Sequence, residues 1–169
     1  MYYVNCFFVY SFLGFLFETL LSFFTKQNFN SGILYGPITP IYGIGVILIL
    51  TISHYFFMNL HLPRWRETVI VFFILIAALT LLEWFGGILI EKLFGVVFWD
   101  YSKLPFHIGH YISLEISFIW GILSILLIYV IKPVINPIVE SIPTSVSIIL
   151  IILGIIDLIA TVLHLKGII

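Results

Sequence analysis

Long apolar runs separated by short polar breaks organise the whole chain. A membrane-spanning helix needs about 20 mostly apolar residues, and five of the runs reach that length. The breaks between them hold Gly, Pro, Asn, Ser and charged residues, which are typical of helix ends. The pattern predicts an all-α, polytopic membrane helix bundle that forms a single transmembrane domain over residues 1–169. The expected helices cover residues 2–25, 40–60, 68–94, 110–131 and 144–165.

Two connections are unusual because they are too apolar for solvated loops. Residues 32–40 are rich in Gly and Pro, and residues 95–109 are aromatic but interrupted by charged residues and Pro. Irregular backbone at membrane depth is tolerated only where protein buries it or where it lines a watery cavity. We therefore expect both segments to lie in the membrane interface or to re-enter the bilayer.

The first and third apolar runs carry similar sets of small and acidic residues, spaced three, four and four along the chain. This spacing places each set on one helical face. A broken, Pro-containing segment and another apolar run follow both sets, so we predict two helical hairpins in parallel orientation plus a fifth helix. Glu83 would be the counterpart of Glu18, and a site would lie between the hairpins. Ordinary packing of small residues is the alternative. The sets are Ser11, Gly14, Glu18 and Ser22, and Thr80, Glu83, Gly87 and Glu91.

Composition supports a membrane protein and excludes several other classes. The chain is 62% hydrophobic and 9% charged, whereas a soluble domain is about a quarter charged. Its net charge of −1 gives no reason to expect nucleic-acid binding. The lone cysteine, Cys6, excludes an internal disulfide and a thiolate metal cluster. The first run lacks a basic leader and a cleavage site, so we expect a retained span. The basic residues are divided too evenly between the two sides to orient the chain.

Acidic residues within the apolar runs are the main candidates for function. A charged residue at the centre of a spanning helix costs about 2.5–3.5 kcal/mol on insertion scales, so it usually faces the bundle interior or a cavity. We expect a polar substrate-binding cavity whose carboxylates bind a cation, relay protons or hold a polar headgroup. The alternative is that the carboxylates only link helices through hydrogen bonds, and for Asp157 both interpretations stay open. The expected substrate-binding residues are Glu18, Glu83, Trp84, Glu91, Trp99, Asp100, Tyr101 and Glu115.

Two histidines raise the question of a metal. His107 and His110 are spaced i, i+3, and with Asp100 and Glu115 they could supply nitrogen and oxygen ligands. The spacing matches no specific metal signature. We therefore expect neither a metal nor another cofactor. The chain also has no P-loop and no nucleophile elbow, so we expect no catalytic residue and no ATP hydrolysis by the chain itself.

A series of short motifs in a fixed order resembles the bacterial "putative ABC transporter permease" (type IV) family. The motifs lie between residues 7 and 125. The resemblance implies a permease that works with a separate ATPase subunit, and such an assembly would need at least a homodimer. The motifs are GFLFE (14–18), GPITPIYG (36–43), LEWFGG (82–87) with Glu91, WDYS (99–102), PF (105–106) and WG (120–121).

These observations predict a small transport-associated protein of a bacterial cytoplasmic membrane. Its partners would be membrane lipids, an ATPase subunit and further copies of itself, without nucleic acid. Two other functions fit the same residues. One is a membrane-embedded enzyme that acts on a lipid or an isoprenoid, with two carboxylates in acid–base roles. The other is a non-catalytic structural partner of a larger membrane complex.

Overall fold

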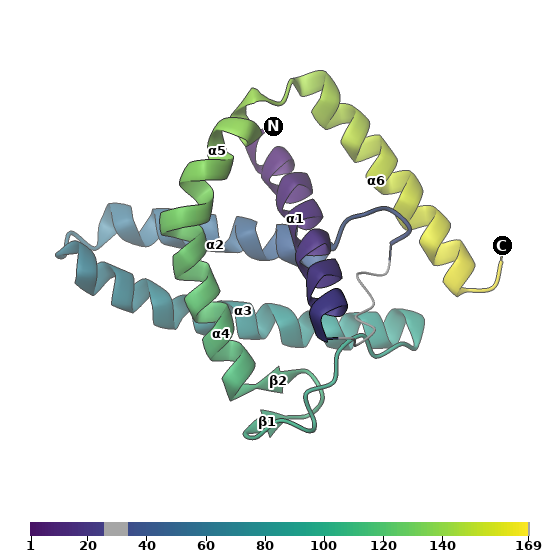
Figure 1. The fold of residues 1–169 in the computed structure, drawn as a ribbon, viewed down its shortest axis with the longest axis horizontal. Coiled ribbons are helices and arrows are strands. Elements are labelled where there is room, and N and C mark those ends of the chain that lie inside the picture. Colours follow the sequence, from purple (N-terminus) through teal and green to yellow (C-terminus); the bar gives the residue numbers. More distant parts are fainter. Residues whose placement is uncertain (26–33, 169) are drawn as a thin grey trace. The chain divides into compact units, whose positions relative to one another are not determined.

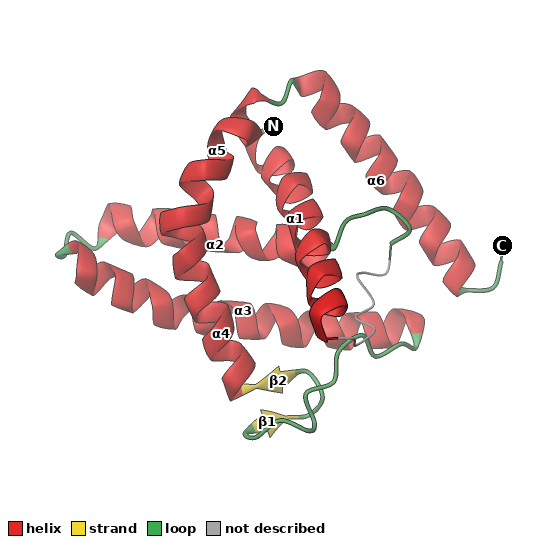
Figure 2. Cartoon of the chain, in the orientation of Figure 1, coloured by secondary structure: helices red, strands yellow, loops and turns green. Residues whose placement is uncertain are grey.

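Helices make up most of the described chain, and the rest is loops and one short hairpin (Figures 1 and 2). The computed structural model describes residues 1–25 and 34–168. Within these residues, five helical segments are long and apolar enough to cross a membrane, so the predicted all-α membrane fold is confirmed. The elements are α1 (Tyr2–Thr25), α2 (Pro40–Asn59), α3 (Arg64–Phe94), β1 (His107–Ile108), β2 (Ile112–Ser113), α4 (Leu114–Leu126), the π-helical turn η1 (Leu127–Ile131), α5 (Lys132–Ser141) and α6 (Thr144–Leu165).

The chain forms two compact units, which we describe separately. The first comprises Met1–Val46 and Asn136–Ile169, and the second comprises Ile47–Ile135. Helices α2 and α5 each contribute residues to both units. Whether the chain behaves as one transmembrane domain stays a prediction.

In the second unit, α3 and α4 pack closely because the facing side chains on α4 are small. The buried α4 residues are Ser117, Gly121 and Ser124. A Cβ atom on Gly121 would collide with the side chains of Phe72 and Ile76. Small residues let two membrane helices approach to backbone contact. On α3 the buried residues recur at every fourth position, which forms one continuous ridge. They are Glu67, Val71, Leu75, Leu79, Glu83 and Gly87.

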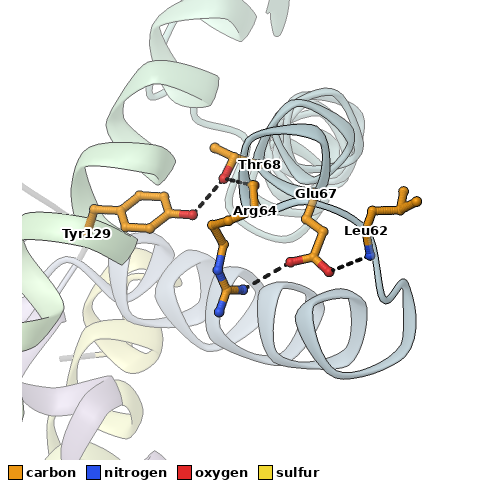
Figure 3. A network of polar contacts seen from close by, with 5 residues as sticks. All are labelled: Leu62, Arg64, Glu67, Thr68 and Tyr129. Atoms are coloured by element: carbon orange, nitrogen blue, oxygen red, sulfur yellow. Dashed lines mark hydrogen bonds and ion pairs between the residues drawn. The ribbon is translucent and has the colours of Figure 1, made fainter.

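The third helix begins at Arg64, four residues before the predicted start at residue 68. The buried carboxylate of Glu67 accepts hydrogen bonds from the backbone N–H of Leu62 (3.2 Å) and from the Arg64 guanidinium (3.1 Å), as Figure 3 shows. The Thr68 hydroxyl hydrogen-bonds with the Tyr129 hydroxyl at 2.6 Å. The polar sequence predicts a loop, but it forms the first turn of α3. The reason is that Glu67 pairs with the Arg64 side chain and accepts the backbone N–H of Leu62 just before the helix.

The predicted fourth helix, over residues 110–131, is wrong at both ends. Residues 107–113 form the β1–β2 hairpin, and the helix begins at Leu114. It also continues through Pro133 to Ser141 instead of stopping at residue 131. Proline lacks an N–H and its ring clashes with the carbonyl four residues earlier. The wider π-helical turn immediately before Pro133 accommodates the ring, so the helix is not broken.

In the first unit, Asn5 joins three helices through its side-chain amide. Its Nδ2 donates to the Val139 carbonyl at the end of α5 (3.1 Å), and its Oδ1 accepts from the Ser147 hydroxyl in α6 (2.6 Å). Asn5 and Ser147 are both buried. A buried amide in an apolar helix is expensive unless it is paired. This pairing therefore fixes the start of α1 against α5 and α6.

Asp157 of α6 holds the irregular segment that precedes α2. Its two carboxylate oxygens accept the backbone N–H groups of Tyr35 and Gly36, both at 2.9 Å. A Cβ atom at residue 36 would lie 2.7 Å from Asp157 Oδ2, so only glycine allows this close approach. Of the two interpretations of Asp157, these contacts favour a role in packing. Residues 32 and 33 lie outside the described residues, and re-entry of the 32–40 segment stays a prediction.

Filling the space at Gly121 should loosen the α3–α4 contact. Gly121→Ala places a methyl group against Phe72 and Ile76, and such overpacking costs about 1–3 kcal/mol. We expect a lower midpoint of thermal unfolding for the purified protein in detergent. Ile119→Ala, at an exposed position on the same helix, serves as the control and should change the midpoint little. Equal midpoints for the two variants would contradict the packing described for α4.

Asp157→Asn should release the segment before α2. An amide has one acceptor oxygen, so one of the two N–H donors of Tyr35 and Gly36 loses its partner, at a cost of about 1–3 kcal/mol. We expect faster chymotrypsin cleavage after Tyr35 and a lower unfolding midpoint. Glu115→Gln removes a charge from an exposed carboxylate and is the matched control. Unchanged cleavage in Asp157→Asn would show that the carboxylate does not hold the segment.

Candidate functional site

Helix α3 presents Glu83, Gly87 and Glu91 on one face, since residues four apart are neighbours on a helix. The helix ends at Phe94, and the following Gly95 turns the chain with a positive φ of 69° while its N–H donates to the Glu91 carbonyl (2.8 Å). The chain then folds back along this face until α4 begins. The three α3 residues therefore meet side chains from the connecting segment and from α4.

Glu83 is the centre of this arrangement. It is 5% exposed, and its Oε1 accepts from the Tyr101 hydroxyl (2.6 Å) while its Oε2 accepts from Trp120 Nε1 (3.2 Å). One turn before it, the Thr80 hydroxyl donates to the Ser117 hydroxyl (2.8 Å). The ion pairs formed within residues 1–25 and 34–168 do not include Glu83. Its carboxylate is thus buried and hydrogen-bonded on both oxygens, but it forms no ion pair with any residue that the structure describes.

Backbone hydrogen bonds fix Tyr101 in place. Its N–H donates to the His110 carbonyl (2.7 Å), and its own carbonyl accepts the N–H of Leu104 (2.9 Å). The β1–β2 hairpin pairs His107 with Ser113 and returns the chain to α4. Because the segment folds on itself in this way, the Tyr101 hydroxyl is directed at α3 without a regular element carrying it.

Glu91 is hydrogen-bonded by a tyrosine, Tyr111, as Glu83 is by Tyr101. The Tyr111 hydroxyl donates to Glu91 Oε2 at 2.8 Å, and the Tyr111 ring lies against Gly87, where a Cβ atom would collide with it. Burial, followed by the bond to Glu91, raises the pKa of Tyr111, so this hydroxyl stays a donor. The indole of Trp99 meets the Tyr111 ring edge-on, with centroids 6.1 Å apart. Trp99 Nε1 is buried and has no hydrogen-bond partner within the described residues.

Asp100, His107 and His110 are exposed residues of the segment between α3 and α4. Hydrogen bonds from Ser102 and then from His110 lower the pKa of Asp100 to about 2. His110 Nδ1 lies 3.3 Å from Asp100 Oδ1, whereas His107 Nδ1 lies 3.0 Å from the Leu104 carbonyl oxygen. The two histidines therefore have separate partners. Within the described residues, no three His, Cys, Asp or Glu side chains are grouped to hold a metal.

The structure brings together about half of the predicted site residues. Trp84 and Glu115 are exposed, and within the described residues neither side chain hydrogen-bonds to Glu83 or Glu91; Trp84 packs against Phe85 instead. The Asp100 carboxylate pairs with the Ser102 N–H and with His110, not with Glu83 or Glu91. Glu18 belongs to the first unit, so the predicted site between the hairpins stays a prediction. We call the assembled set the Glu83 cluster, which comprises Glu83, Glu91, Trp99, Tyr101, Tyr111 and Trp120.

Sequence reasoning missed Tyr111 and Trp120 as members of the site. Both belong to the aromatic background of the chain, which made them difficult to single out. A signal did exist for each of them. Gly87 lies in the middle of a helix that favours larger residues, so it indicates a bulky partner. Trp120 precedes Gly121, where a Cβ atom would collide with Phe72 and Ile76 of α3.

A few positions of the α3–α4 contact have counterparts where α1 meets α2. Tyr42 hydrogen-bonds with Glu18, as Trp120 does with Glu83. A Cβ atom on the next residue, Gly43 or Gly121, would collide with a matching pair in the preceding helix. The members of each pair stand eleven and seven residues before the glutamate, and they are Phe7 and Ser11 in α1, and Phe72 and Ile76 in α3.

These equivalent contacts agree with the predicted repeat and define its register. The sequence predicts that Glu83 is the counterpart of Glu18, and the contacts align the same two residues. The parallel orientation of the two hairpins in the membrane stays a prediction.

The comparisons with known proteins identify one family. A family model described as "Putative ABC-transporter type IV" matches residues 5–162. Searches of curated proteins and of solved structures found no match. The matched region includes every residue of the Glu83 cluster and the α1–α2 contact. The chain is thus an integral membrane, transport-associated protein that belongs to the "Putative ABC-transporter type IV" family.

Proposed function

We propose that the chain is the membrane-embedded subunit of a transport assembly and that the Glu83 cluster is its polar site. The observation that carries this proposal is the environment of Glu83. Its carboxylate lies within a spanning helix, is 5% exposed and has no cationic partner among the described residues. Such groups are expensive in a membrane and usually mark a pathway for an ion or a substrate.

The donors around Glu83 explain how the site could respond to a ligand. Tyr101 comes from the irregular segment and Trp120 comes from α4, so the two oxygens are held by different parts of the unit. A substrate that takes one donor bond would uncouple the segment from α3. Trp99 offers a buried N–H without a partner in the described chain, which could receive an acceptor group of the substrate.

Energy for transport would come from a second protein. The chain has no P-loop, whereas its family is described as an ABC-transporter type. We therefore propose a separate ATPase subunit, at least two copies of this chain and a bacterial cytoplasmic membrane as its location. Family membership favours transport over the lipid enzyme and the structural partner considered from the sequence.

Glu83→Gln tests the site. Glutamine can accept from Trp120 and donate to the Tyr101 hydroxyl, so the change removes the charge and keeps the shape. We expect normal membrane insertion but at least about a tenfold loss of function, as for a ligand contact worth about 1.4 kcal/mol. Complementation of a deletion strain, with membrane levels measured alongside, is the readout.

Glu115→Gln is the matched control for that experiment. It makes the same chemical change on a spanning helix, at an exposed carboxylate outside the Glu83 cluster. It should complement fully. If Glu83→Gln also complemented fully at equal membrane levels, Glu83 would have no part in the site.

A separate experiment tests the assembly. The tagged chain should purify from its own membranes with a P-loop subunit and with ATP hydrolysis, whereas the chain expressed alone should hydrolyse none. Both preparations are assayed in the same detergent at equal concentrations. A preparation without an ATPase subunit that converts a membrane lipid to a new product would replace the transport proposal with the enzyme interpretation.

A further inference from the structure

The β1–β2 hairpin and the start of α4 expose three large apolar side chains. Phe106 precedes β1 and is 79% exposed, Ile108 ends β1 and is 68% exposed, and Leu114 begins α4 and is 50% exposed. The Leu114 N–H donates to the Phe106 carbonyl (3.2 Å), so these two residues are neighbours. Figure 1 shows β1 at the outer edge of the second unit. We call Phe106, Ile108 and Leu114 the hairpin wedge.

Phe106 has a backbone conformation that a bulky residue rarely adopts. Its φ is 54°, in the left-handed region that glycine enters without steric cost. The side chain is too exposed for packing within the described chain to offset this strain. Strained backbone persists mainly where it serves a function. We therefore expect the Phe106 ring to make a favourable contact outside the chain.

The contacts of the segment between α3 and α4 hold it beside the membrane-spanning part of α3. Charged residues flank residues 68–90 of α3, and Glu83 is the only charged residue between them. These residues extend about 34 Å at 1.5 Å per residue, enough to cross a hydrocarbon core of about 30 Å. The Tyr101 hydroxyl donates to Glu83, and the Tyr111 ring lies against Gly87, both within this stretch. The segment is therefore held at membrane depth, where lipid covers the side chains that the protein leaves exposed.

The surroundings of the hairpin wedge suit the boundary between lipid headgroups and acyl chains. Lys103, His107 and His110 are exposed polar residues of the same segment. Tryptophan and tyrosine are enriched at this boundary, and the segment contains Trp99 and Tyr101. A surface of mixed character binds there by burying its apolar side chains and keeping its polar groups at the headgroups.

We propose that the hairpin wedge inserts among the lipid acyl chains at the membrane interface. This goes beyond the proposed function, because the partner is the bilayer and the residues differ from the Glu83 cluster. The Tyr101 N–H donates to the His110 carbonyl (2.7 Å), which ties Tyr101 to the hairpin that carries the wedge. Contact with lipid thus helps to hold the segment whose Tyr101 hydroxyl reaches Glu83.

Fluorescent labelling of single cysteines in lipid nanodiscs tests the insertion. Cys6 is the one cysteine of the chain, so Cys6→Ala provides a background for Phe106→Cys or Ile108→Cys. Each cysteine carries an environment-sensitive fluorophore, and the nanodiscs contain phosphatidylcholine with a spin label on the acyl chain. A water-soluble quencher is added to parallel samples. We expect a blue-shifted emission, and stronger quenching by the acyl-chain label than by the water-soluble quencher, at both positions.

Two exposed positions serve as controls. Ile119→Cys lies within the apolar helix α4 and should be quenched by the acyl-chain label. Arg66→Cys lies at the charged start of α3 and should be quenched mainly by the water-soluble agent. The labelled positions are all exposed, so the labels should leave the fold intact, and equal unfolding midpoints for the labelled variants check this.

Two results would overturn the proposal. Quenching of Phe106→Cys and Ile108→Cys that matches Arg66→Cys would place the hairpin wedge in water. Weak quenching by both agents, with a disulfide between two copies of the chain at Phe106→Cys, would show that a second copy covers it. Neither result bears on Glu83, because complementation by Glu83→Gln is scored without reference to the hairpin. The lipid contact and the proposed transport site can therefore fail independently.

Discussion

The second unit depends on keeping one carboxylate satisfied in an apolar setting. Glu83 cannot reach water, so its oxygens require donors from the protein, and those donors define where the neighbouring elements lie. Tyr101 ties the irregular segment to α3, and Trp120 ties α4 to α3. Small residues on α4 make the second bond short enough to form. The hydrogen bonds that the buried Glu83 carboxylate requires thus fix the positions of α3 and α4. Apolar contacts alone would let these two helices slide past each other in lipid.

The helices could be predicted from the sequence because a helix must be long and apolar enough to cross the lipid bilayer. Backbone N–H and C=O groups that lack hydrogen bonds are also costly in lipid, which favours helices. The ends of α1 and α6 follow directly from that constraint. The predicted helix bounds were wrong where polar residues have hydrogen-bond partners inside the protein. Glu67 and Arg64 satisfy each other, so a loop-like sequence became a helical turn. Pro133 was predicted to stop a helix because sequence does not reveal a preceding π-helical turn.

The candidate site was predicted in its acidic half and missed in its aromatic half. Carboxylates stand out in an apolar chain, whereas Tyr111 and Trp120 resemble the many other aromatic residues until their partners are known. The pairing of Glu18 with Glu83 was predicted from the sequence, and the contacts at Gly43 and Gly121 agree with that pairing.

The π-helical turn between α4 and α5 changes the phase of the helix that contains it. One extra residue in a turn rotates every later side chain by about 100° relative to an uninterrupted α-helix. The helical phase over Leu114–Leu126 therefore differs from the phase that begins at Lys132. Ser117 and Gly121 precede the turn and belong to the second unit, whereas the fully buried Val139 follows it and belongs to the first unit. Removing a single residue from 127–131 would restore a regular helix while turning Val139 out of its packing.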